Sequence, residues 1–173
     1  MAFYRADPEM SSYLRTLIKR FAAEGRPHLA QNIAITWIRY TTNHPIQSGG
    51  IGACWSENVL FYPASIVKII YAVAIEHWIQ KDFLIDNFEL RRALQAMIAE
   101  SSNDATSYLV DLLTGTSSGH SLSGVQWECW KKQRRIINGW LNTLNWPELQ
   151  NINCCQKTWE ESPYGREKDF YGE

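Results

Sequence analysis

A serine and a lysine placed three residues apart are the first residues in this sequence that could do chemistry. Ser65 and Lys68 lie in the stretch FYPASIVKII, residues 61–70, which is otherwise largely apolar. Residues i and i+3 of a helix share a face, so the hydroxyl and the amine can point into one cleft. A serine hydroxyl needs a base to become a nucleophile, and burial lowers the pKa of a lysine so that its neutral amine can be that base. The simpler alternative is a serine that caps a helix and a lysine whose amine reaches the surface.

A second pair of polar residues lies in the stretch ESSNDATSYLV, residues 100–110, where one predicted helix ends and the next begins. Taken alone, Ser101 and Asn103 are most simply the cap and first turn of the second helix. A hydroxyl at such a turn can also pass a proton to a leaving group, and an amide can hold a substrate carbonyl. Both interpretations stay open on the residues themselves.

Apolar periodicity predicts the elements that must position these residues. Helices are expected over residues 9–24, 65–81, 88–100, 104–113 and 125–144. Strands are expected over residues 32–41 and 51–61, which are rich in β-branched and aromatic residues. The helix that follows Ser65 has apolar residues around its whole circumference, so we expect it to be buried. After Pro147 the pattern is lost, and an irregular loop is expected to the end.

The two polar groups, in this order, resemble the S-x-x-K and S-x-N motifs of the β-lactamase and penicillin-binding protein superfamily. The chain is most similar to the class A β-lactamase-like serine hydrolases, because two predicted strands precede PASIVK and DAT…YLVDLLTG follows the second motif. The resemblance covers roughly residues 10–165 and is most specific between 61 and 115. It implies an α/β (α+β) fold of the β-lactamase/transpeptidase type, with a helical cluster and an antiparallel sheet. It also implies that Ser65 is the acylated nucleophile, Lys68 its activating amine, Ser101 the proton shuttle and Asn103 a substrate-binding residue.

The sequence departs from the family at the third motif, which is Lys-Thr-Gly on a strand. Residues 157–159 read Lys-Thr-Trp, and a tryptophan would fill the space that glycine leaves for the substrate. This segment is better compared with the family's Ω-like loop, which carries a deacylating glutamate. The resemblance then makes Glu160 and Glu161 candidates, while Glu148 in WPELQN lies too early. For each of them the alternative is a solvated surface carboxylate.

Members of this family continue beyond the point that corresponds to the end of this sequence. We therefore expect residues 1–173 to be a single domain that lacks the C-terminal part of the fold. The sheet would then keep an open apolar edge, which self-association or a partner segment would cover. The candidate cleft, and with it the activity, is expected to be compromised.

Composition excludes several other classes of protein. The net charge of −1 gives no basic surplus for nucleic acid or an anionic membrane. The longest apolar run is too short to span a bilayer, and the N-terminus has no signal-like apolar region. A cytoplasmic location is expected for the chain as given, and a periplasmic one if an N-terminal extension precedes it. The 4 cysteines and 4 histidines show no metal-binding spacing, so neither a metal nor a cofactor is expected.

These observations together predict a serine hydrolase that acts by acyl transfer through Ser65. Its substrate would be a small molecule with an amide or ester bond, such as a β-lactam. Two alternatives stay open: a vestigial, non-catalytic domain, and an amidase of the D,D-peptidase or glutaminase type.

Overall fold

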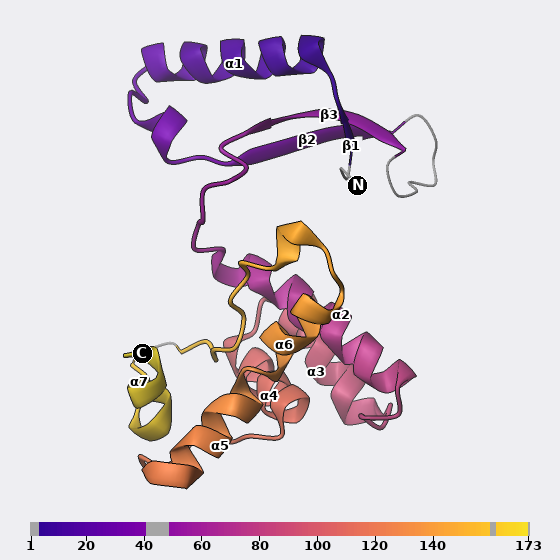
Figure 1. Cartoon of the computed structure of the whole chain (residues 1–173), viewed down its shortest axis with the longest axis vertical. Helices are drawn as coiled ribbons and strands as arrows, with labels where there is room; N and C mark the ends of the chain where they lie inside the picture. Colours follow the sequence, from indigo (N-terminus) through magenta and orange to yellow (C-terminus); the bar gives the residue numbers. More distant parts are fainter. Residues whose placement is uncertain (1–3, 41–48, 160–161, 173) are drawn as a thin grey trace. The chain divides into compact units, whose positions relative to one another are not determined.

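The computed structural model describes residues 4–40, 49–159 and 162–172. The chain forms two compact units, Met1–Tyr62 and Pro63–Glu173. Strands occur in the first unit and most of the helices in the second, so the protein is a mixed α+β protein, as the sequence predicted (Figure 1).

The first unit is a small sheet with one long helix on it. Strand β3 (Gly50–Trp55) is central, with β1 (Tyr4–Ala6) parallel on one side and β2 (Ile35–Tyr40) antiparallel on the other. The sheet is therefore mixed, whereas the sequence predicted an antiparallel one. Strand β1 was missed because three residues are too few to show a period. β3 also ends six residues earlier than the predicted strand, which ran to residue 61.

Helix α1 (Pro8–Ala23) begins where the sequence places a capping residue. The Asp7 side chain accepts a hydrogen bond from the backbone N–H of Met10, which satisfies one of the free donors at the helix start. Met10, Leu14 and Ile18 recur at helical spacing and pack with Ala53 of β3. Figure 1 shows α1 lying along one face of the sheet.

The second unit is helical. Its elements are the 3-10 turn η2 (Ala64–Ile66), α2 (Val67–Gln80), α3 (Phe88–Ala99), α4 (Asn103–Thr114), α5 (Gly124–Arg134), α6 (Ile136–Thr143), the 3-10 turn η3 (Pro147–Leu149) and α7 (Gly165–Tyr171). The helix predicted over residues 125–144 is broken at Arg135, which leaves the helical conformation. The predicted irregular tail contains α7. Its buried residues Glu167 and Phe170 contact Ser118 and Trp130, respectively.

The core of this unit lies among α2, α3, α4 and α6. Its most buried residues are Tyr71, Ala74, Ile75, Leu90, Met97, Leu109, Val110 and Ile137. A smaller cluster joins Trp130 of α5 and Phe170 of α7 to Cys155. These two clusters hold together the elements that carry the candidate site.

The prediction that α2 is buried all round is wrong. Ile66, Ile69 and Val73 are 70%, 59% and 55% exposed, and they form one stripe along the α2 helix and the turn before it. Ile98 of α3 is also exposed. Apolar composition shows that a helix can be buried, but the packing of its neighbours decides which face is covered. Here α3 and α4 cover only the face that carries Tyr71 and Ile75.

Within the described residues, no helix combines the length and the apolar character that crossing a membrane requires.

Candidate functional site

Lys68 is the centre of the polar cluster that the sequence predicted. It lies in the first turn of α2 and is only 2% exposed. Its ammonium nitrogen, Nζ, donates to Asn103 Oδ1 at 2.9 Å, to Ser101 Oγ at 3.0 Å and to the Ser101 main-chain oxygen at 2.5 Å. Three of the predicted site residues, from α2 and from the start of α4, are thus in direct contact.

The surroundings of Lys68 act on its charge in opposite directions. Burial lowers the pKa of Lys68 from its ordinary value of 10.5, because the ammonium loses its hydration. The three oxygens around Nζ belong to uncharged groups, and no described carboxylate forms an ion pair with it. Lys68 is therefore a desolvated amine without an ionic partner among the described residues, while its three hydrogen bonds stabilise the ammonium form.

The turn before α4 frees Ser101 and Asn103 for this contact. The N-cap of α4 is Ser102, whose hydroxyl accepts a hydrogen bond from the backbone N–H of Ala105 at 3.2 Å. The residues on either side of the cap can therefore turn toward Lys68. Ser101 has a φ of 54°, a left-handed conformation that costs free energy in a residue with a Cβ atom.

Ser65, the predicted nucleophile, lies outside the hydrogen-bonded cluster. It is exposed and belongs to the 3-10 turn η2, one turn before Lys68. Among the described residues, neither its hydroxyl nor its backbone N–H has a hydrogen-bond partner. The preceding residue, Ala64, has a φ of 48°, so the approach to the serine is a second left-handed position. The sequence placed Ser65 at the start of α2, whereas the α-helix begins at Val67.

The segment that contains Lys157 and Thr158 runs along α4. The Thr158 hydroxyl donates to the main-chain oxygen of Asn103 at 3.2 Å, and the Ser107 hydroxyl donates to the main-chain oxygen of Thr158 at 3.0 Å. Lys157 points away from Lys68, since its Nζ lies 2.5 Å from Asp111 Oδ2 and 2.8 Å from Ser118 Oγ. The segment is not a strand, in agreement with the doubtful match to the third family motif.

The candidate glutamates are not brought to the cluster by any described contact. Glu160 and Glu161 lie outside the residues that the structure describes. Glu148 belongs to η3 and is exposed, as the surface alternative predicted.

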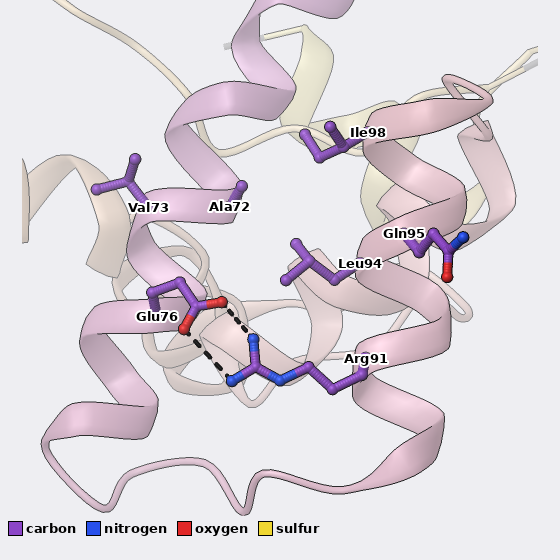
Figure 2. Close-up of a pocket in the computed structure, with 7 residues that line it drawn as sticks. All are labelled: Ala72, Val73, Glu76, Arg91, Leu94, Gln95 and Ile98. Atoms are coloured by element: carbon purple, nitrogen blue, oxygen red, sulfur yellow. Dashed lines mark hydrogen bonds and ion pairs between the residues drawn. The ribbon is translucent and has the colours of Figure 1, made fainter. Parts of the chain in front are cut away.

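A groove lies between α2 and α3, with a volume of about 500 Å³. Figure 2 shows Ala72 and Val73 on one side of it, Leu94 and Ile98 on the other. Arg91 pairs with Glu76 at one end of the groove, and the same guanidinium is 2.7 Å from Asp86. The groove is lined mainly by apolar atoms, and the hydrogen-bonded cluster around Lys68 is not part of its lining.

Metal chemistry has no site in the described part of the chain, where no group of three or more His, Cys, Asp or Glu residues could hold an ion. Cys154 and Cys155 are both buried, but they belong to different apolar clusters. Burial raises the pKa of each thiol, to about 12 for Cys154, so both are protonated at neutral pH.

Comparison of the chain with protein-family models, with curated proteins and with solved structures found no match. The function is therefore inferred from the residues and their geometry.

Proposed function

We propose that this protein is a serine hydrolase of the β-lactamase-like type that acts by acyl transfer through Ser65. The observation that carries the proposal is the environment of Lys68, a buried amine without a counter-charge that contacts both Ser101 and Asn103. A lysine held only for structure would more simply reach the surface or pair with a carboxylate. The proposal includes the β-lactamase/transpeptidase-like version of the α+β fold.

The chemistry assigns one role to each residue. The neutral amine of Lys68 takes the proton from Ser65 Oγ, which attacks the carbonyl carbon of the substrate and forms an acyl-enzyme. Lys68 passes that proton through the Ser101 hydroxyl, with which it is already hydrogen-bonded, to the leaving nitrogen or oxygen. Water then hydrolyses the acyl ester and restores the Ser65 hydroxyl. The backbone N–H of Ser65, which has no partner among the described residues, is a candidate donor to the oxyanion.

Asn103 would bind the substrate through its amide nitrogen. Because Asn103 Oδ1 accepts the hydrogen bond from Lys68, the same side chain presents Nδ2 as a donor. A donor at this place suits the carbonyl oxygen of an amide, which is the chemistry expected for a substrate with an amide or β-lactam-like bond.

Covalent labelling by a fluorescent penicillin tests the proposal. Because the cleft is expected to be compromised, we expect the wild-type chain to gain the mass of one penicilloyl group only slowly, and the Ser65→Ala variant to gain none. The Ser12→Ala variant is the matched control, because Ser12 is an exposed serine of α1. Equal labelling of the wild type and the Ser65→Ala variant, or no labelling of either, would refute acyl transfer through Ser65.

The fate of the acyl group separates a lactamase from a peptidase-like amidase. Glu161 is the proposed deacylating residue, so its replacement by glutamine is expected to prolong the life of the label. A label that persists equally in wild type and in the Glu161→Gln variant would favour the D,D-peptidase or glutaminase type.

A vestigial domain is the second candidate, and one observation favours it. Ser65 is exposed and its hydroxyl has no hydrogen bond to Lys68, so the amine is not placed to take its proton in this arrangement. A vestigial domain would bind no label at all, even at high concentrations of penicillin.

A further inference from the structure

Helix α4 carries a stripe of polar residues that take no part in its N-cap, which is Ser102. Asn103, Ser107 and Asp111 follow one another at intervals of four residues, so they lie on one face of the helix. The neighbouring face is apolar and buried, with Leu109, Val110 and Leu113 in the core. A regular polar stripe beside a buried face indicates that something polar packs along it.

Residues 156–158, which we call the strap, occupy this stripe. The Thr158 hydroxyl donates to the Asn103 main-chain oxygen at 3.2 Å, and the Ser107 hydroxyl donates to the Thr158 main-chain oxygen at 3.0 Å. One turn further along α4, Asp111 accepts from Lys157 at 2.5 Å. The side chains of Lys157 and Asp111 are 7% and 27% exposed, so this ion pair is shielded from water mainly at the lysine. Each residue of the stripe is thus bonded to the strap, Ser107 and Asp111 through their side chains and Asn103 through its main-chain oxygen.

The strap is also fastened to α2, close to Lys68. The Tyr71 hydroxyl donates to the main-chain oxygen of Gln156 at 3.0 Å. Tyr71 is 1% exposed and follows Lys68 by three residues, so the two lie on one side of α2. Burial raises the pKa of Tyr71 above its ordinary value, which keeps the hydroxyl protonated and able to donate. The strap therefore joins α2 beside Lys68 to α4 at Asn103.

We infer that the strap holds the Lys68–Asn103 contact in place and that Thr158 is its positioning residue. The inference deepens the proposed acyl transfer and rests on it for its kinetic consequence. Lys68 and Asn103 come from different helices, so their contact at 2.9 Å requires α2 and the first turn of α4 to keep their relative positions. Thr158 is the strap residue that bonds to Asn103 itself, while Gln156 and Lys157 anchor the strap at other points.

Two variants of Thr158 distinguish the effect of its hydroxyl from the effect of its methyl group. The Thr158→Val variant keeps the shape of threonine and loses the donor to Asn103, whereas Thr158→Ser keeps the donor. Thr143→Val is the matched control, because the Thr143 hydroxyl also donates to a main-chain oxygen, at 2.6 Å, but in the exposed last turn of α6. Labelling by penicillin is compared at the plateau of each variant's pH profile, so that a change in the pKa of Lys68 does not enter the comparison. We expect it to slow about two- to tenfold in Thr158→Val, because Asn103 then holds the substrate less well and one neutral hydrogen bond is lost, and to be unchanged in the other two.

A second measurement does not depend on activity. The titration of Lys68 is followed by NMR on protein with carbon-13-labelled lysine, and the signal is assigned with a Lys68→Arg variant. Asn103 accepts a hydrogen bond from the ammonium form, so its displacement disfavours that form and lowers the pKa of Lys68 further. The titration midpoint of Lys68 is expected to fall in Thr158→Val. It is expected to fall also in Ser107→Ala, which removes the hydrogen bond from the Ser107 hydroxyl to the main-chain oxygen of Thr158. In Thr158→Ser and Thr143→Val the midpoint should stay at the wild-type value.

The two measurements separate the possible failures. A wild-type chain that is never labelled overturns the proposed function, and the lysine titration still decides whether the strap positions Asn103. Equal midpoints in wild type, Thr158→Val and Ser107→Ala would overturn the inference. A midpoint that falls as much in Thr143→Val as in Thr158→Val would also overturn it, because the effect would then be one of general loosening.

Discussion

Replacing Glu167 by glutamine should destabilise the helical unit strongly, because it breaks a fully buried ion pair. Glu167 of α7 and Arg134 of α5 are both 0% exposed and are bonded to each other. The guanidinium lies 4.8 Å from the ring centroid of Trp130, and its Nε and Nη1 atoms have no hydrogen-bond partner among the described residues. Few other groups can therefore compensate the charge of Arg134 once the carboxylate is gone.

The size of the effect follows from what remains around Arg134. Removal of one partner of a buried ion pair costs about 3–5 kcal/mol of unfolding free energy. Asp111 lies 3.2 Å from Arg134 and is itself only partly buried, so it still compensates part of the charge. We therefore expect a loss of about 3 kcal/mol, at the lower end of that range. For a chain of this length, this corresponds to a melting temperature lower by roughly 6–12 °C.

Chemical and thermal unfolding followed by tryptophan fluorescence would measure the change. The matched control is Glu89→Gln, which removes the carboxylate of an exposed pair with Arg92 at 2.9 Å and should leave the midpoint unchanged. The double variant Arg134→Met with Glu167→Leu removes both charges and should recover most of the lost stability. If Glu167→Gln unfolds at the same denaturant concentration as Glu89→Gln, the buried pair does not have the energetic role argued for it.

Three further predictions concern the candidate site and the helices that carry it. Because burial lowers the pKa of Lys68, the neutral fraction of its amine grows as the pH rises toward that pKa. The rate of penicillin labelling should therefore increase between about pH 6 and about pH 9. A constant rate over this range would contradict the role of Lys68 as the base. Ile75→Ala, at a residue with no exposure, should cost about 2–5 kcal/mol in a urea titration. Val73→Ala, at a residue 55% exposed, should cost less than about 0.5 kcal/mol, and equal losses would restore the expectation that α2 is buried all round. Ala64→Gly relieves a φ of 48° and should raise the unfolding free energy by about 0.5–1 kcal/mol. Gly115→Ala should lower the unfolding free energy, because position 115 has a φ of 62° and the added Cβ would lie 2.9 Å from Gln133. Melting curves that move in the same direction for both variants would argue against backbone strain at Ala64.

Sequence patterns predicted a helix reliably where the apolar residues that indicate it lie within the helix itself. The helices that contain Leu14, Lys68 and Leu90 were predicted to within about two residues. The first and third show apolar periodicity over three or more turns, and the second is a long and nearly continuous apolar run. The pattern failed where an element depends on distant partners. Helix α7 has only seven residues, and it is fixed by the contact of Phe170 with Trp130 and by the bond of Glu167 to Arg134.

The candidate site was predicted in part. The spacing of Lys68, Ser101 and Asn103 within their motifs indicated residues that could work together, and the structure places them in contact. The sequence did not indicate the part played by Thr158, because its partner Asn103 is 55 residues away. The four-residue spacing of Asn103, Ser107 and Asp111 beside the apolar face of α4 was the signal that could have revealed the strap.

The sequence by itself determined the chemistry that is available and the helices that carry it. Residue type and spacing act over a few residues, so they place a hydroxyl and an amine one turn apart and set the bounds of α2. Only the tertiary structure decided that Lys68 bonds to Ser101 and Asn103, which lie 33 and 35 residues away, and that it does not bond to the nearby Ser65. The reason is physical: the local pattern gives a helix its apolar residues, while the packing of neighbouring helices decides which side chains lose their water and which atoms replace it.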